Sequence, residues 1–150
     1  ASANAIWSRL AAANLTSAEN IRSSSESGLK ECGLSRQKVR YAKALAEARI
    51  DFGKLGKLDS KDVLERLTEV KGIGTWTAQI YCIFSLGRAD VFAPGDLALQ
   101  ETVRLLFDLE ERPNEKSLAM MSQSWSPWRA VAARLLWAYY RIEKNREGIR

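Results

Sequence analysis

An apolar residue stands at every third or fourth position along most of this chain, which is the period of an α-helix. Ser35, Asp59 or Ser60, and Ser126 precede such stretches and are predicted helix N-caps, and Pro127 is predicted to take a first helical position. No run of alternating apolar and polar residues bounded by turns competes with this pattern. The pattern predicts an all-α fold with helices over residues 6–13, 39–46, 60–70, 75–86, 96–106, 118–121 and 126–143.

Length and composition predict one soluble domain. The 150 residues are 46% hydrophobic and 27% charged, which gives enough apolar surface for a single core. The longest apolar stretch, residues 78–86, is interrupted by Gln79 and Ser85 and is far shorter than the roughly 20 residues of a membrane span, so it is predicted to be a core helix. Residues 1–10 already have the pattern of a helix interior. We therefore expect a single domain over residues 1–150 that is truncated at its N-terminus.

Histidine is absent, and cysteine occurs only at Cys32 and Cys82. The lack of histidine excludes catalytic triads and imidazole-bound zinc or iron, and two thiols are too few for a four-cysteine metal site. An enzyme of this composition must therefore use carboxylate, lysine or cysteine side chains. The formal net charge of +5 favours a polyanionic partner, although many basic proteins bind no nucleic acid.

The segment Gly72-Ile-Gly74 lies in a short turn between two predicted helices. A reversal this tight needs glycine where φ is positive or where another chain approaches closely. The amides of Gly74 and Thr75 would then stand at a helix N-terminus, where phosphate oxygens can accept hydrogen bonds from them. Lys71 lies in the same turn and would reinforce a phosphate contact. The alternative is an ordinary corner between two helices inside a helical protein.

Asp96 follows Pro94-Gly95 at the start of another predicted helix. The simplest interpretation of this carboxylate is an N-cap that accepts hydrogen bonds from the amides two or three residues later. The dipole of the same helix favours a negative charge at this position. A fixed anion could also stabilise a sugar that becomes positively charged during a reaction. Alternatively, the carboxylate could hold a water molecule. Both interpretations stay open at this point.

Three separated motifs carry a family resemblance: residues 67–78, Asp96 within Pro94–Gln100, and Trp125–Arg129. In this order they resemble the helix-hairpin-helix DNA glycosylases, and within them the alkyladenine (3-methyladenine DNA glycosylase II) branch. The resemblance spans nearly the whole chain and implies an all-α helical bundle or barrel of the helix-hairpin-helix DNA glycosylase type. It implies a base excision repair enzyme that flips out and excises alkylated purines by hydrolysis of the N-glycosidic bond. Bifunctional members carry a lysine where this chain has Trp76, so a monofunctional enzyme is implied.

The resemblance also implies roles for individual residues. Asp96 matches the catalytic aspartate, and Trp76 and Trp137 are the candidates for the base pocket. The implied DNA contacts are Lys71, Gly72, Ile73, Gly74, Thr75 and Arg129. The backbone carbonyls of Thr68, Val70 and Ile73 would hold a Na⁺ or K⁺ ion, and no other cofactor is expected. The remaining tryptophans are predicted to belong to the core: Trp7, Trp125 and Trp128.

The expected partner is double-stranded DNA that contains alkylated bases, with no membrane association and a monomeric state. The expected location is the bacterial cytoplasm, at the nucleoid, or the eukaryotic nucleus. The side chain that fills the gap left by the flipped base is expected upstream of Ala1. Basic side chains such as Lys43 and Arg134 are predicted to be mostly solvated, with a subset contacting phosphates. The alternative function is a non-catalytic helix-hairpin-helix module that only binds DNA.

Overall fold

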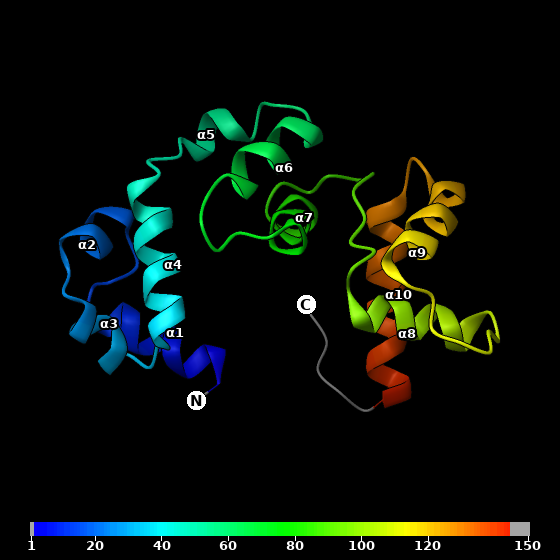
Figure 1. Cartoon of the computed structure of the whole chain (residues 1–150), viewed down its shortest axis with the longest axis horizontal. Coiled ribbons are helices and arrows are strands. Elements are labelled where there is room, and N and C mark those ends of the chain that lie inside the picture. Colours follow the sequence, from blue (N-terminus) through cyan, green and yellow to red (C-terminus); the bar gives the residue numbers. More distant parts are fainter. Residues whose placement is uncertain (1, 145–150) are drawn as a thin grey trace. The chain divides into compact units, whose positions relative to one another are not determined.

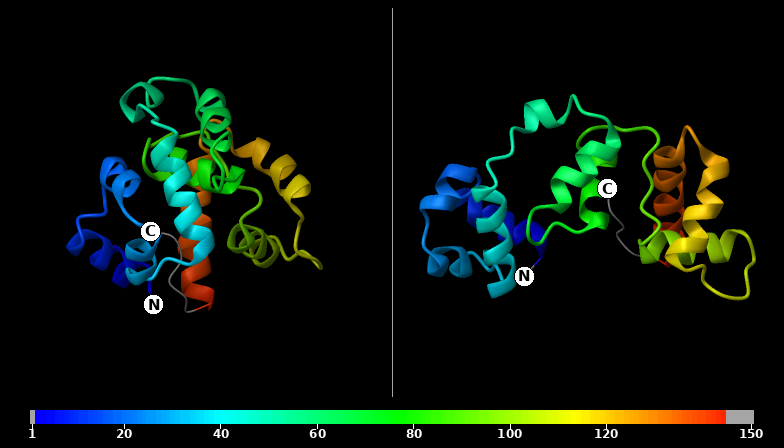
Figure 2. Two further views of the ribbon diagram at one scale, coloured as in Figure 1. Left: turned by 60° about the vertical axis from the view of Figure 1, so that its left-hand side comes forward. Right: turned by 45° about the horizontal axis from the view of Figure 1, so that its top comes forward.

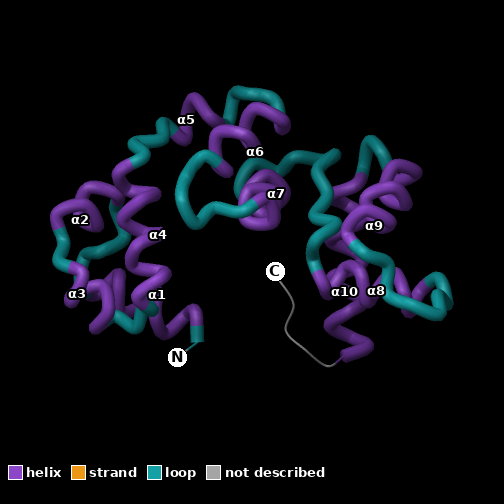
Figure 3. The backbone as a smooth tube through the Cα atoms, in the orientation of Figure 1, coloured by secondary structure: helices purple, strands orange, loops and turns teal. Residues whose placement is uncertain are grey.

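The computed structural model describes residues 2–144, and Figure 3 shows helices joined by loops, with no strand among these residues. The predicted all-α fold is confirmed. The chain divides into two compact units, Ala1–Gly74 and Thr75–Arg150. The expectation of a single domain stays a prediction. None of the described helices combines the length and the apolar character needed to cross a membrane.

The first unit consists of short helices that begin at side-chain caps. Its elements are α1 (Ala3–Ala12), α2 (Ala18–Ser23), α3 (Glu26–Glu31), α4 (Arg36–Glu47), α5 (Phe52–Leu55) and α6 (Ser60–Thr68). Ser35 caps α4 and Asp59 caps α6, as predicted. α2 lies beside α4 (Figures 1 and 2), where the Arg22 guanidinium donates to the Ala46 carbonyl at 2.7 Å and the Lys43 ammonium donates to the Arg22 carbonyl at 3.0 Å. Lys43 therefore binds within the unit and is not a solvated side chain.

The second unit is built around a long C-terminal helix. Its elements are α7 (Thr75–Phe84), α8 (Leu97–Leu106), α9 (Glu115–Met121), a 3₁₀ turn (Ser122–Trp125) and α10 (Arg129–Lys144). α8 lies against α10 (Figure 1). The buried side chains of this unit include Ala78, Cys82, Ile83, Leu99, Val103, Leu118, Ala133, Leu136 and Trp137. Both cysteines of the chain are free and buried.

Several predicted helix boundaries are wrong. α10 begins at Arg129 instead of Ser126, because Ser126 ends the preceding 3₁₀ turn (Ser122–Trp125) and its hydroxyl donates to Asp90 at 2.9 Å. α1 forms where expected but buries none of its residues. The helices α2, α3 and α5 were not predicted, because four to six residues are too few to establish a period.

Side chains predicted to lie inward are also exposed in places. Of the tryptophans assigned to the core, Trp7 is 62% exposed and Trp128 is 61% exposed, whereas Trp125 packs edge-on against Phe92 with ring centroids 5.5 Å apart. Periodicity shows which side chains share a face, but it does not show whether another element covers that face.

Candidate active site and nucleic-acid interface

The Asp96 carboxylate is the most densely hydrogen-bonded side chain among the predicted site residues. Its Oδ1 accepts from the amides of Ala98 at 2.9 Å and Leu99 at 3.0 Å, which is the geometry of an N-cap. The same oxygen accepts from the indole Nε1–H of Trp137 at 3.2 Å, and Oδ2 accepts from the indole Nε1–H of Trp76 at 2.8 Å. The N-cap interpretation is confirmed. The two indole donors go beyond what a cap requires.

These contacts fix an anion in a nearly dry position. Asp96 is 8% exposed, and all four of its donors are uncharged N–H groups, so they orient the carboxylate without an ion pair. Each of the two carboxylate oxygens has two lone pairs, which makes about four acceptor sites in all. Because Oδ1 accepts three of these hydrogen bonds and Oδ2 accepts one, Oδ2 retains acceptor capacity. The arrangement can stabilise a positive charge that develops next to Oδ2, or it can hold a water molecule there.

The two candidate pocket tryptophans differ in exposure. Trp76 lies in the first turn of α7 and is 43% exposed, so part of its ring is open for stacking while its N–H holds Asp96. Trp137 lies on α10 and is 2% exposed, with its ring tilted by 33° against Phe84 at a centroid distance of 5.5 Å. Trp137 is thus buried beside the carboxylate, where its indole donates to Oδ1. A base contact by either ring stays a prediction.

The turn between α6 and α7 uses its two glycines for different reasons. Gly72 has φ +95°, and a Cβ added there would overlap the ring of Tyr41. Gly74 has no atom within 4 Å of the place a Cβ would occupy, so packing inside the described chain does not require glycine at this position. Because glycine has no side chain, another molecule can approach the backbone closely at this position. The open position of Gly74 therefore favours an external contact at this turn.

The carbonyls predicted to bind an alkali cation belong to Thr68, the last residue of α6, and to Val70 and Ile73 in the turn that follows. The Val70 carbonyl accepts from the Ile73 amide at 2.9 Å and, like any backbone carbonyl, keeps a second lone pair. The Thr68 hydroxyl donates to the Leu64 carbonyl at 2.8 Å, which leaves the Thr68 carbonyl as its possible ligand atom. Neutral oxygen donors suit a hard cation, so the turn is chemically compatible with Na⁺ or K⁺. Within residues 2–144, no cluster of three His, Cys, Asp or Glu side chains is placed to hold a metal.

Arg129 has an internal partner. Its Nε donates to Asp90 Oδ1 at 2.7 Å, and its Nη2 donates to Asp90 Oδ2 at 2.9 Å and to the Asp90 carbonyl at 3.1 Å. The guanidinium and the Ser126 hydroxyl lower the pKa of Asp90 to about 2. A cation in the first turn of a helix opposes the dipole, and this ion pair supplies the reason for it. A DNA contact by Arg129 stays a prediction, and it would be made by a guanidinium already bound to Asp90.

Residues 1–130 match the model of the HhH-GPD superfamily of base excision DNA repair proteins. The chain belongs to this superfamily. It is 31% identical over 157 residues to DNA-3-methyladenine glycosylase 1 of Schizosaccharomyces pombe, covering 99% of this chain and 69% of that protein.

Solved structures agree with this family assignment. The S. pombe 3-methyladenine DNA glycosylase in complex with abasic DNA has a TM-score of 0.82 and 32% identity, covering 94% of this chain and 71% of the other. The DNA-3-methyladenine glycosidase of Bacillus halodurans has a TM-score of 0.78 and 34% identity, covering 91% of this chain and 66% of the other. The predicted helix-hairpin-helix glycosylase fold is confirmed. The chain spans roughly two thirds of the length of these relatives.

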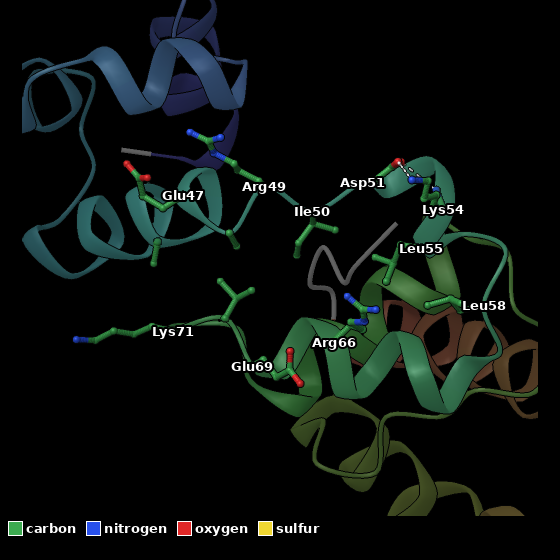
Figure 4. Close-up of a pocket in the computed structure, with 13 residues that line it drawn as sticks. Glu47, Arg49, Ile50, Asp51, Lys54, Leu55, Leu58, Arg66, Glu69 and Lys71 are labelled. Carbon is green, nitrogen blue, oxygen red and sulfur yellow. Dashed lines mark hydrogen bonds and ion pairs between the residues drawn. The ribbon is translucent and has the colours of Figure 1, made fainter.

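The HhH-GPD chain also has a cavity that sequence patterns did not indicate. A space of about 720 Å³ lies in the first unit, between the end of α4, α5, α6 and the following turn (Figure 4). Its apolar lining includes Ile50 and Leu55, and its charged lining mixes both signs. Lys71 belongs to the lining, and Figure 4 shows its side chain extending away from the other labelled residues. A phosphate contact by Lys71 stays a prediction.

Proposed function

We propose that this HhH-GPD protein is a monofunctional DNA glycosylase that flips out alkylated purines of the 3-methyladenine type and hydrolyses their N-glycosidic bonds in double-stranded DNA. The observation that carries the proposal is the Asp96 carboxylate, held by its own helix and by two indoles with acceptor capacity left on Oδ2. The names of its relatives, DNA-3-methyladenine glycosylases, support the same substrate class.

The proposed chemistry suits the residues that are present. A purine alkylated at a ring nitrogen already carries a positive charge, so it can leave without a general acid, and this protein has no histidine to supply one. The remaining requirement is to stabilise the oxocarbenium-like sugar, which the Asp96 carboxylate meets by electrostatic attraction. The exposed part of the Trp76 ring would attract the electron-poor base by cation–π interaction, worth about 0.5 to 2 kcal/mol. Flipping costs a few kcal/mol and costs least for bases that pair poorly.

The absence of an amine nucleophile at Trp76 supports the monofunctional part of the proposal. A Schiff base requires an amine such as that of lysine. Trp76 has no amine, and its indole instead donates a hydrogen bond to Asp96. The nearest lysine in sequence, Lys71, lies in the preceding turn, where we assign it to a DNA phosphate. We expect borohydride to trap no covalent complex with abasic DNA.

The turn between α6 and α7 supplies the proposed DNA grip. The N-terminus of α7 presents amides that suit a phosphate oxygen. The Thr68, Val70 and Ile73 carbonyls would bind Na⁺ or K⁺, whose charge would attract a DNA phosphate. These contacts carry no sequence information, which fits a protein that searches any sequence for a lesion. We further propose that the protein acts as a monomer on chromosomal DNA.

Base release from methylated duplex DNA tests the proposal. The protein is incubated with methylated DNA, and the released purines are separated and identified by chromatography. We expect free alkylated adenine from the unmodified protein and none above background from Asp96→Asn. Asparagine is an equally good N-cap, so this variant removes the charge and keeps the cap. A non-catalytic DNA-binding module would bind the duplex with salt-dependent affinity and release no base.

A further inference from the structure

We propose that Arg134 is a positioning residue for the Asp96 site: it holds the end of α7 against α10 and, through Phe84, sets the orientation of the Trp137 indole. The inference rests on the proposed function, and it assigns a role to a side chain predicted from sequence to be mostly solvated. All four residues lie in the second unit. Arg134 is placed seven residues before Arg141 on the same helix, which provides a matched control.

The first contact joins two helices. The Arg134 Nη2 donates to the carbonyl of Ile83 at 2.9 Å. Ile83 is the penultimate residue of α7, where helix carbonyls lack intrahelical donors and the dipole favours a cation. Arg134 therefore caps α7 from α10. Trp76 stands at the other end of the same helix, so the cap fixes the helix that carries one of the two indole donors to Asp96.

The second contact joins Arg134 to the other indole. Its Cζ lies 4.6 Å from the centroid of the Phe84 ring, and the same ring packs against Trp137 at 5.5 Å. Trp137 is buried and donates to Asp96 Oδ1 at 3.2 Å. A planar guanidinium can stack on an aromatic face, whereas an ammonium contacts the ring as a compact point charge. The sequence of contacts thus runs from Arg134 through Phe84 and Trp137 to the carboxylate.

This placement predicts a defect in chemistry and no selective defect in DNA binding. Without the guanidinium, Phe84 loses a group that holds its ring, so the buried Trp137 packs against a less ordered neighbour and its Nε1–H is displaced from the best alignment with Asp96. A hydrogen bond to a charged acceptor contributes strongly, so we expect the single-turnover rate constant of Arg134→Met to fall by about tenfold. Its DNA affinity should match that of Arg141→Met, which loses the same charge from the same helix.

Two readouts test the inference in the full chain: single-turnover base release from methylated duplex, and the NMR resonance of the Trp137 indole Nε1–H, assigned by comparison with Trp137→Phe. We expect the resonance to move in Arg134→Met and to stay in Arg141→Met. Arg134→Lys keeps the charge and an ammonium that can donate to the Ile83 carbonyl, so it is the milder variant; we expect a displaced resonance and a smaller rate loss. Phe84→Leu should reproduce the Arg134→Met defect, and the double variant should lose no more than the larger single loss.

Three results would overturn the inference. One is an Arg134→Met variant that matches Arg141→Met in both rate and resonance. Another is a rate loss with an unmoved resonance and a selective loss of DNA affinity, which would make Arg134 a phosphate contact. The third is full recovery in Arg134→Lys, which would show that the planar group is not needed. If the unmodified protein releases no base, the proposed function fails, while the resonance in Arg134→Met still tests the network.

Discussion

Replacing Asp90 by asparagine is expected to destabilise the protein in a pH-dependent way. Asp90 accepts a bidentate pair from Arg129 and a hydrogen bond from Ser126, which join the chain after α7 to the start of α10. These contacts lower the pKa of Asp90 to about 2, whereas an unfolded aspartate titrates near 3.8. A difference of this size corresponds to about 2.5 kcal/mol at full strength. Because the side chain is 34% exposed, solvent screening reduces the expected contribution to about 1 to 1.5 kcal/mol.

The sign of the pH dependence follows from the lowered pKa. The unfolded chain binds the proton more tightly than the folded chain, so the stabilisation is complete above about pH 4 and disappears as the pH falls toward 2. Thermal unfolding followed by circular dichroism measures this. At pH 7 we expect Asp90→Asn to melt about 2 to 5 °C below the unmodified protein. The difference should shrink steadily as the pH is lowered through this window.

Asp108→Asn provides the matched control, because it removes the same charge from an exposed loop residue of the same unit. This variant should melt close to the unmodified protein across the pH range. The reasoning would be refuted by a melting difference for Asp90→Asn that stays constant between pH 7 and pH 3, or by an equal loss in Asp108→Asn. In either case the Asp90–Arg129 pair would contribute nothing specific to the folded state.

Three further predictions concern the turn and the indole donors. Gly72→Ala should lower the melting temperature, because its Cβ would overlap the Tyr41 ring at φ +95°, whereas Gly74→Ala should melt normally and weaken DNA binding. Equal melting temperatures for the two variants would contradict this. Trp76→Phe keeps a ring but removes the donor to Asp96, so single-turnover base release should fall by about tenfold at unchanged DNA affinity, and an unchanged rate would remove the indole N–H from the site. Lys71→Gln should reduce the slope of log affinity against log salt by about one and leave the rate at saturating DNA unchanged, whereas an unchanged slope would show that Lys71 contacts no phosphate.

Helix starts were predictable because the interactions that make them are local. Ser35 and Asp59 each accept from an amide three residues later, and Asp96 accepts from amides two and three residues later. Such contacts need only the spacing of residues along the chain. The same holds for the turn with Gly72, whose positive φ is a property of the local backbone.

Other features of the candidate site depend on residues that are distant in sequence. The Trp137 donor to Asp96 lies 41 residues away, and the Asp90–Arg129 pair spans 39 residues. Local spacing predicted a cap at Ser126, but the hydroxyl of that serine donates to Asp90 instead. Arg134 looked like one basic side chain among several, and only the position of α7 beside it supplies the Ile83 carbonyl and the Phe84 ring.

The sequence by itself thus determined the helical class, the caps and the identity of the groups that can act: a carboxylate, indoles and a glycine turn. Only the tertiary structure decided that Asp96 meets two indoles and that Arg129 meets Asp90. The physical reason is that the helical period of apolar residues shows which side chains share a face of one helix. Which other element covers that face depends on how whole helices pack, and packing brings together atoms that are far apart along the chain and leave no local pattern.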